Sequence, residues 1–111
     1  MTKRIKIEES SGNIFADLGL PDAEELLLKA QIVFEIADVM KSRKLTQSKV
    51  AALTGTAQPD LSNLMRGRFK GFSVERLMVM LTGLGRDVEI TVRPAPKSRK
   101  TGGISFKREA A

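Results

Sequence analysis

The chain has 111 residues, of which 41% are hydrophobic and 29% are charged, a composition that suits one small domain with its own core. It contains no cysteine and no histidine, which excludes disulfides, thiolate nucleophiles, the usual zinc sites and histidine acid–base chemistry. The net charge of +6 is concentrated, because residues 41–70 carry seven Lys or Arg and one acidic residue, Asp60, as nucleic-acid-binding surfaces do.

The first 21 residues are predicted to form an arm. They mix charged residues, Ser and Gly with a few apolar side chains and show no sustained period. They contain no apolar run of signal-peptide length, and no stretch of the chain approaches the length of a membrane span. We therefore expect a cytoplasmic protein.

A first helix is predicted over residues 22–44. Asp22 is the expected N-cap, and Glu25 lies three residues later, as in a capping box. Apolar residues then recur at helical spacing as far as Met40.

Three shorter helices follow. Thr46 is the expected N-cap of a helix over residues 47–54 that ends at Gly55. Thr56 is the expected N-cap of the next helix, which runs to Arg66 and tolerates Pro59 in its first turn. A basic loop at residues 67–72, anchored by its two phenylalanines, precedes a helix that begins after Ser73 and ends at Gly85, with Leu77, Leu81 and Leu84 facing inward. Residues 22–87 thus form the predicted folded domain.

The spacing of apolar residues changes after this domain from a helical to an alternating pattern. Val88, Ile90 and Val92 alternate with polar residues before Pro94, which predicts a half-buried strand at 88–94. A lone strand leaves its backbone unpaired, so we expect the strands of two copies to pair across a two-fold axis. Residues 95–111 have a linker-like composition and are predicted to be a flexible basic tail.

The two middle helices satisfy the demands of a helix-turn-helix unit that reads DNA. Such a unit needs a small residue where its helices cross, a glycine in the turn and apolar residues that fix the second helix. Ala51, Gly55 and Leu61 meet these demands, and Val50 and Leu64 supply flanking core contacts. Thr56 departs from the apolar residue that usually follows the turn glycine.

Residues 22–85 resemble the phage-repressor-type, or XRE, helix-turn-helix family. The resemblance rests on Leu45-Thr46-Gln47, Ala51, Gly55, Gln58, Ser62 and Arg66-Gly67-Arg68. The wider segments 13–19 and 84–90 are similar to the HigA-like antitoxins, which neutralise a RelE-type ribonuclease toxin and repress their own operon. The resemblance implies an all-α, four- to five-helix repressor-like domain with a short C-terminal dimerisation strand. It also implies a sequence-specific, homodimeric repressor that binds a double-stranded operator.

The resemblance assigns roles to residues on and around the second helix of the unit. That helix would enter the major groove, where the side-chain amides of Gln58 and Asn63 can pair with adenine. The methyl group of Ala57 and the ring of Pro59 could meet a thymine methyl group. Asp60 fits this surface only if it faces cytosine or pairs with a neighbouring Arg. The candidate phosphate contacts are Thr46, Gln47, Ser62, Arg66, Arg68 and Lys70.

Two other functions stay open beside the antitoxin. The chain could be a plain XRE-type regulator without a toxin, or a protein-interaction adaptor built on the same scaffold. An enzyme is not expected, and neither are cofactors or metals. Glu24 and Glu25 are adjacent in a first helical turn, where they complement the helix dipole. Gly83 and Gly85 lack the strand, spacing and lysine of a phosphate-binding loop.

Overall fold

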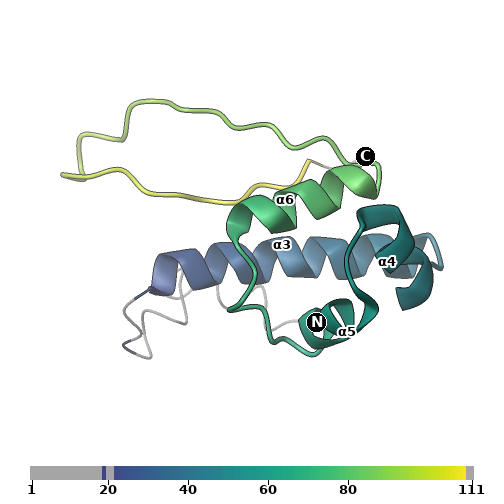
Figure 1. Cartoon of the computed structure of the whole chain (residues 1–111). Helices are drawn as coiled ribbons and strands as arrows, with labels where there is room; N and C mark the ends of the chain where they lie inside the picture. Colours follow the sequence, from purple (N-terminus) through teal and green to yellow (C-terminus); the bar gives the residue numbers. More distant parts are fainter. Residues whose placement is uncertain (1–18, 20–21, 110–111) are drawn as a thin grey trace.

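The computed structural model describes residue 19 and residues 22–109, and the rest of the predicted arm lies outside the described residues. The described residues form the helices α3 (Ala23–Ser42), α4 (Gln47–Thr54), α5 (Gln58–Met65) and α6 (Val74–Gly83), which are labelled in Figure 1. These confirm the predicted all-α, four-helix domain. Within the described residues, no helix is both long and apolar enough to cross a bilayer.

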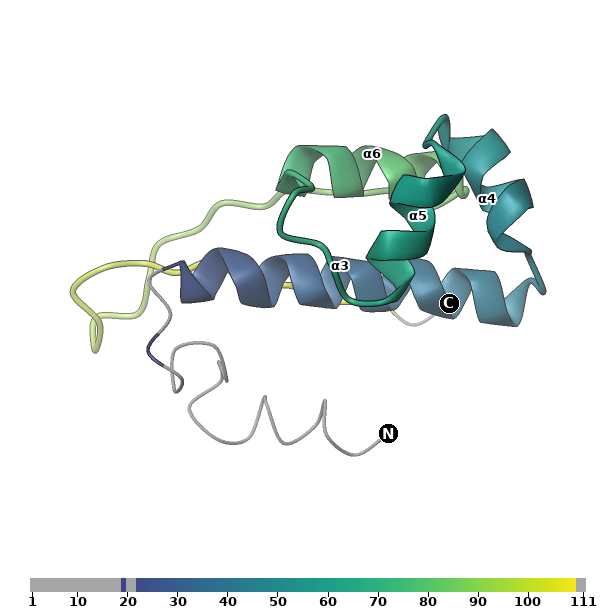
Figure 2. The ribbon, with the colours of Figure 1, turned by 60° about the horizontal axis from the view of Figure 1, so that its bottom comes forward.

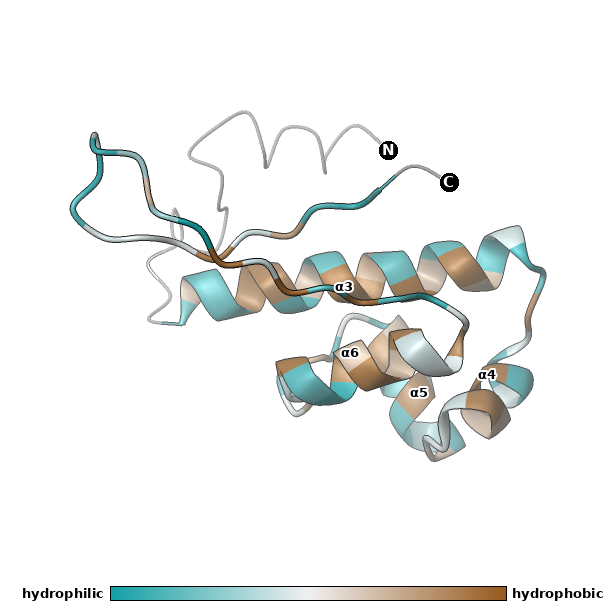
Figure 3. Cartoon of the chain, turned by 90° about the horizontal axis from the view of Figure 1, so that it is seen from above, coloured by the Kyte–Doolittle hydropathy of each residue, from teal (hydrophilic) through white to brown (hydrophobic). Residues whose placement is uncertain are grey.

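The core lies between α3, α6 and the α4–α5 pair. Figure 3 shows hydrophobic residues along α3 and α6 where the two helices face each other. The prediction that Leu77, Leu81 and Leu84 point inward is confirmed, since all three are at most 4% exposed. The largest fully buried side chains come from all four helices and from the residue after α6: Ile36, Val39, Val50, Leu61, Leu64, Leu77, Met80 and Leu84.

Several helix ends form as predicted from local sequence. The Thr46 hydroxyl accepts a hydrogen bond from the Lys49 N–H at 3.1 Å, and the Ser73 hydroxyl accepts one from the Arg76 N–H at 3.0 Å. Gly55 has φ 68° and Gly85 has φ 87°, left-handed conformations that a side chain would strain. These ends fix the lengths of α4 and α6.

One predicted cap is wrong, and another lacks its side-chain hydrogen bond. Asp22 is the N-cap of α3, as predicted, but its side chain makes no capping hydrogen bond. The N-cap of α5 is Ala57, which has no side-chain oxygen, and not Thr56. Thr56 is 6% exposed, because it takes the buried position after the turn glycine that an apolar residue more often fills.

The predicted strand at 88–94 does not form among the described residues. We call residues 86–109 the C-terminal loop: it leaves the end of α6, extends away from the helices and returns toward α3 (Figure 1). The alternating pattern is present, but a strand needs a second backbone to pair with. Among the described residues, 88–94 make no backbone hydrogen bond.

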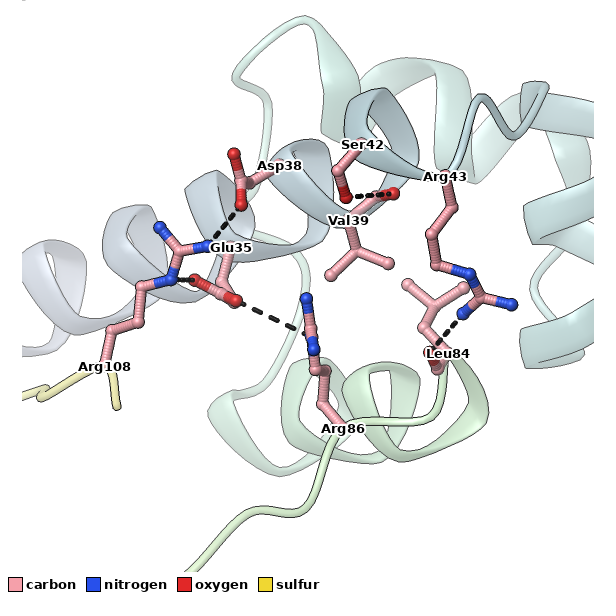
Figure 4. A network of polar contacts seen from close by, with 8 residues as sticks. All are labelled: Glu35, Asp38, Val39, Ser42, Arg43, Leu84, Arg86 and Arg108. Atoms are coloured by element: carbon pink, nitrogen blue, oxygen red, sulfur yellow. Dashed lines mark hydrogen bonds and ion pairs between the residues drawn. The ribbon is translucent and has the colours of Figure 1, made fainter. Parts of the chain in front are cut away.

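One buried carboxylate on α3 pairs with residues near both ends of this loop. Glu35 is 8% exposed, and its two oxygens lie 3.8 Å from Arg86 Nε and 3.1 Å from Arg108 Nε (Figure 4). Arg108 also pairs with Asp38, one turn further along α3. Phe106 is half-buried against the core. The predicted flexible tail at 95–111 thus includes residues that contact the helical domain.

Candidate nucleic-acid interface

The helices α4 and α5 form a helix-turn-helix unit around the residues predicted for it. Val50, Leu61 and Leu64 are fully buried, and Ala51 is half-buried against the core. In the turn, the N–H groups of Gly55 and Thr56 both donate to the carbonyl of Ala51. These contacts hold α5 at a fixed angle across α3, with its outer side uncovered, as Figure 2 shows.

The hydroxyl of Thr56 has a partner inside this turn. Thr54 Oγ1 lies 2.9 Å from Thr56 Oγ1, and the Thr54 hydroxyl donates to the Val50 carbonyl at 2.8 Å. A buried hydroxyl without a partner would destabilise the fold. The pair of threonines therefore explains how a polar residue is accommodated at this position.

The predicted base readers lie on the outer part of α5. Ala57, Gln58 and Pro59 are exposed at its N-terminal end. Asn63 is half-buried and lies one turn after Pro59, on the same side of the helix. Its Oδ1 accepts a hydrogen bond from Arg68 Nη1 at 3.4 Å, so the Asn63 amide keeps its N–H groups for another partner.

The predicted phosphate contacts lie at the start of α4, on α5 and in the loop that follows α5. Thr46 and Gln47 lie at the start of α4, where the Thr46 hydroxyl is engaged as the N-cap and Gln47 is half-buried. Ser62 is half-buried on α5 itself. The cations Arg66, Arg68 and Lys70 follow α5 and are all exposed. The structure therefore places the base and phosphate candidates around one helix.

Asp60 pairs with an arginine that the sequence analysis did not single out. Arg76 Nη2, on α6, lies 3.6 Å from Asp60 Oδ2, and the Arg76 guanidinium also lies 4.4 Å from the centre of the Phe72 ring. Both partners of the ion pair are about half exposed, so its stabilisation is modest. Its electrostatic effect is local, because it balances the one acidic side chain of α5.

Lys29, on α3, holds the basic loop at residues 67–72 through a hydrogen bond. It is 6% exposed, and its Nζ donates to the Lys70 carbonyl at 3.2 Å and lies 3.3 Å from Glu25 Oε2. A buried ammonium group needs such partners. This role of Lys29 was not predicted from the sequence. The available signal was the position of Lys29, three residues after Leu26 and three before Ile32, on the apolar side of α3.

Gly83 marks a close approach between helices that the sequence analysis also missed. A Cβ atom at this position would lie 3.0 Å from the Leu53 carbonyl oxygen and 3.4 Å from the Thr54 Cα atom, both in α4. The absence of a side chain therefore allows the end of α6 to pack directly on the helix-turn-helix unit.

The chain is similar to known helix-turn-helix proteins. A family described as a helix-turn-helix domain matches residues 14–93. A solved structure described as an XRE family transcriptional regulator is 40% identical, and the match covers 80% of this chain and 100% of that chain with a TM-score of 0.75. No curated protein matches the sequence.

Proposed function

Because this chain belongs to the helix-turn-helix family and is a DNA-binding transcriptional regulator of the XRE type, we propose that it is a homodimeric repressor of a specific operator. We further propose that it is the antitoxin of a toxin–antitoxin pair. The observation that carries the repressor proposal is the exposed N-terminal end of α5, flanked by the cations Arg66, Arg68 and Lys70.

In this proposal α5 lies in the major groove and reads bases with its first two turns. Gln58 is fully available, and Asn63 offers its amide N–H groups while Arg68 holds its oxygen. The apolar surfaces of Ala57 and Pro59 lie beside Gln58 and suit contact with thymine methyl groups.

The surrounding groups contact phosphates and set the register of α5 on the duplex. The N-terminus of α4, with Thr46 and Gln47, supplies N–H groups that favour an anion. Ser62, Arg66, Arg68 and Lys70 supply the remaining contacts. These contacts raise affinity without encoding sequence.

The test is selection of bound duplexes from a random pool, followed by titration of the best site at several salt concentrations. The proposal expects two half-sites about one helical turn apart, or a multiple of it. It also expects affinity to fall steeply with salt, since several phosphates are neutralised. A pool without enrichment and a flat salt response would instead favour a protein-interaction adaptor.

The antitoxin proposal rests on the resemblance of residues 13–19 and 84–90 to HigA-like proteins. The partner would be a RelE-type toxin, with the arm at residues 1–21 as the segment that binds it. Co-expression with the product of the neighbouring gene tests this proposal. A stable complex that abolishes growth arrest by that product supports it, whereas a neighbour without toxicity leaves a plain XRE-type regulator.

A further inference from the structure

Residues 104–108, which we call the returning segment, contact α3 through alternate positions. The Ile104 N–H donates to Glu24 Oε2, near the start of the helix, at 3.0 Å. Phe106 is half-buried against the core, and Arg108 pairs with two carboxylates further along α3. This spacing is that of an extended peptide laid along a surface.

The carboxylates on α3 take their cations from the C-terminal loop. Arg108 Nε lies 3.1 Å from Glu35 Oε1, and the same guanidinium pairs with Asp38 (Figure 4). Among the described residues, the second cation beside Glu35 is Arg86, whose Nε lies 3.8 Å away and makes no hydrogen bond. Because the Glu35 side chain is only 10% exposed, loss of Arg108 would leave its charge poorly compensated. This part of α3 therefore favours a segment that carries a cation.

The returning segment fills the space beside α3 incompletely. A cavity of about 1180 Å³ lies between the C-terminal loop and the helices α3 and α6. Its helical side includes the apolar residues Leu28, Ile32, Val74, Met78 and Leu81. Ile104 lines the same cavity but is 64% exposed. The buried residues of the core cluster all lie between positions 32 and 84, so the returning segment supplies none of them and can leave while the core stays assembled.

We propose that this surface of α3 binds an extended basic segment of a partner protein, and that the returning segment occupies the surface in the free chain. The partner's segment has an apolar residue, an aromatic residue and an arginine at alternate positions, as Ile104, Phe106 and Arg108 have here. Its arginine replaces Arg108 beside Glu35. A segment without a cation is rejected, because the buried carboxylate would lose its compensation.

The charge of the surface selects the class of partner. Glu24, Glu35 and Asp38 all lie on the part of α3 that the returning segment contacts. Their carboxylates repel phosphates, which disfavours nucleic acids and anionic membranes and favours a basic protein segment. The surface is separate from α5, so the inference goes beyond the proposed binding of DNA and does not depend on it.

The returning segment acts as a tethered competitor. Because it belongs to the same chain, its effective concentration beside α3 is on the order of millimolar. A partner therefore binds weakly while the segment is in place, and release of the segment exposes the site.

The probe is a fluorescein-labelled peptide of residues 102–109, and its binding to the full chain is measured by anisotropy without DNA. A loosened variant carries Phe106→Ala and Arg108→Ala. It should bind the peptide at least about tenfold more tightly than the unchanged chain, because the tethered competitor is weakened. Binding to neither protein, or equal affinity for both, overturns the proposal.

Circular dichroism checks that the loosened variant remains folded. Arg108→Ala alone gives the same comparison if the double variant unfolds, since this side chain is 47% exposed and its loss does not open the core. The single variant should also bind the peptide more tightly than the unchanged chain, and equal affinity again overturns the proposal.

Two carboxylates of α3 provide a matched pair of site variants. In the loosened background, Glu35→Gln should lower the affinity for the peptide by about tenfold or more, because a charge-assisted bond to the peptide's arginine is lost. Glu25→Gln, on the same helix but outside the lining of the cavity, should leave the affinity unchanged. Equal effects of the two substitutions would show a general effect of charge and contradict the assigned site.

Changes in the peptide test the stated chemistry. Peptides that carry Phe106→Ala or Arg108→Ala should bind the loosened variant more weakly than the unchanged peptide. A peptide that keeps its affinity without its arginine would show that any apolar segment suffices, which overturns the proposed class of partner.

Dilution separates occupancy by the same chain from occupancy by a second copy. A segment held within one chain blocks the peptide equally at every protein concentration. An unchanged chain that gains affinity for the peptide on dilution would assign the blocking segment to a second copy and contradict the proposal.

Discussion

The guanidinium of Arg76 lies 3.6 Å from the carboxylate of Asp60 and reaches across from α6 to the first turn of α5. This relationship explains how an acidic side chain can belong to a helix that we propose to lie close to phosphates. Of the two arrangements that suit Asp60, a cytosine contact or a neighbouring Arg, the free protein has the second. The ring of Phe72 supports the guanidinium from the core side.

The ion pair predicts a reciprocal pattern of DNA affinities. Arg76→Met should weaken binding to all sequences by about 1 kcal/mol or less, because Asp60 is left to repel phosphates. Asp60→Asn should bind as well as the unchanged protein or better, and the double variant should recover most of the loss. If Arg76→Met lowers the affinity for DNA by the same amount in the Asp60→Asn background, Arg76 itself contacts DNA.

Base readers and phosphate contacts should respond differently to truncation. Gln58→Ala or Asn63→Ala should cost about 1–3 kcal/mol on the operator and relax preference at one base pair. Arg66→Ala or Arg68→Ala should weaken binding to every sequence and lower the salt slope by about one.

A matched control for these charge changes is Lys100→Ala, which removes one exposed cation from the C-terminal loop. It should leave the salt slope unchanged if Arg66 and Arg68 contact phosphates directly. The same slope change in all three variants would show a general effect of net charge. If Gln58→Ala or Asn63→Ala lowered the salt slope and Arg66→Ala or Arg68→Ala relaxed the base preference, the assigned roles would be reversed.

Lys29→Met should free the basic loop from α3, and methionine retains an apolar side chain similar to the stem of lysine. Affinity for all DNA should fall by about tenfold or less, because a single charge-assisted hydrogen bond to the Lys70 carbonyl is lost. The free energy of unfolding should change little, since the partner left behind, Glu25, has a side chain that is 55% exposed and stays hydrated without the ion pair. Fluorescence anisotropy and denaturant titration measure the two quantities.

The control for Lys29 is Glu25→Gln, which removes its other partner at 3.3 Å and leaves the bond to the loop in place. It should bind DNA normally. Equal losses in the two variants would attribute the effect to the ion pair on α3 and contradict the role assigned to the loop contact.

Gly83→Ala should destabilise the fold by about 1–3 kcal/mol, because the added Cβ would meet the Leu53 carbonyl oxygen in α4. Gly71→Ala is the matched control, since a Cβ there meets open space and the backbone is not left-handed. That variant should be neutral or slightly more stable. Equal unfolding midpoints in urea would show that α4 moves aside without cost.

Local chemistry explains how much of this fold could be predicted from sequence. Caps such as Thr46 and Ser73, and the glycine ends at Gly55 and Gly85, depend on residues within one turn of each other. The four described helices and the exposed N-terminal end of α5 could be predicted from such signals. Thr56 failed as the predicted cap of α5 because residue type alone does not decide where a helix begins, whereas Asp22 is the N-cap of α3 without the expected side-chain hydrogen bond.

The remaining features depend on contacts between distant residues. The bond from Lys29 to Lys70 joins positions 41 residues apart, and the approach of Gly83 to Leu53 depends on how α6 is placed against α4. The strand predicted at 88–94 failed for a related reason. Its alternating pattern describes the faces of a strand, but the backbone that it needs is not provided by the described residues of the same chain.

Glu35 is the shared anchor of Arg86 and Arg108, which stand near the two ends of the C-terminal loop. Because one carboxylate pairs with both arginines, loss of the Glu35 charge should weaken both ends of the loop at once, although Arg108 keeps its pair with Asp38.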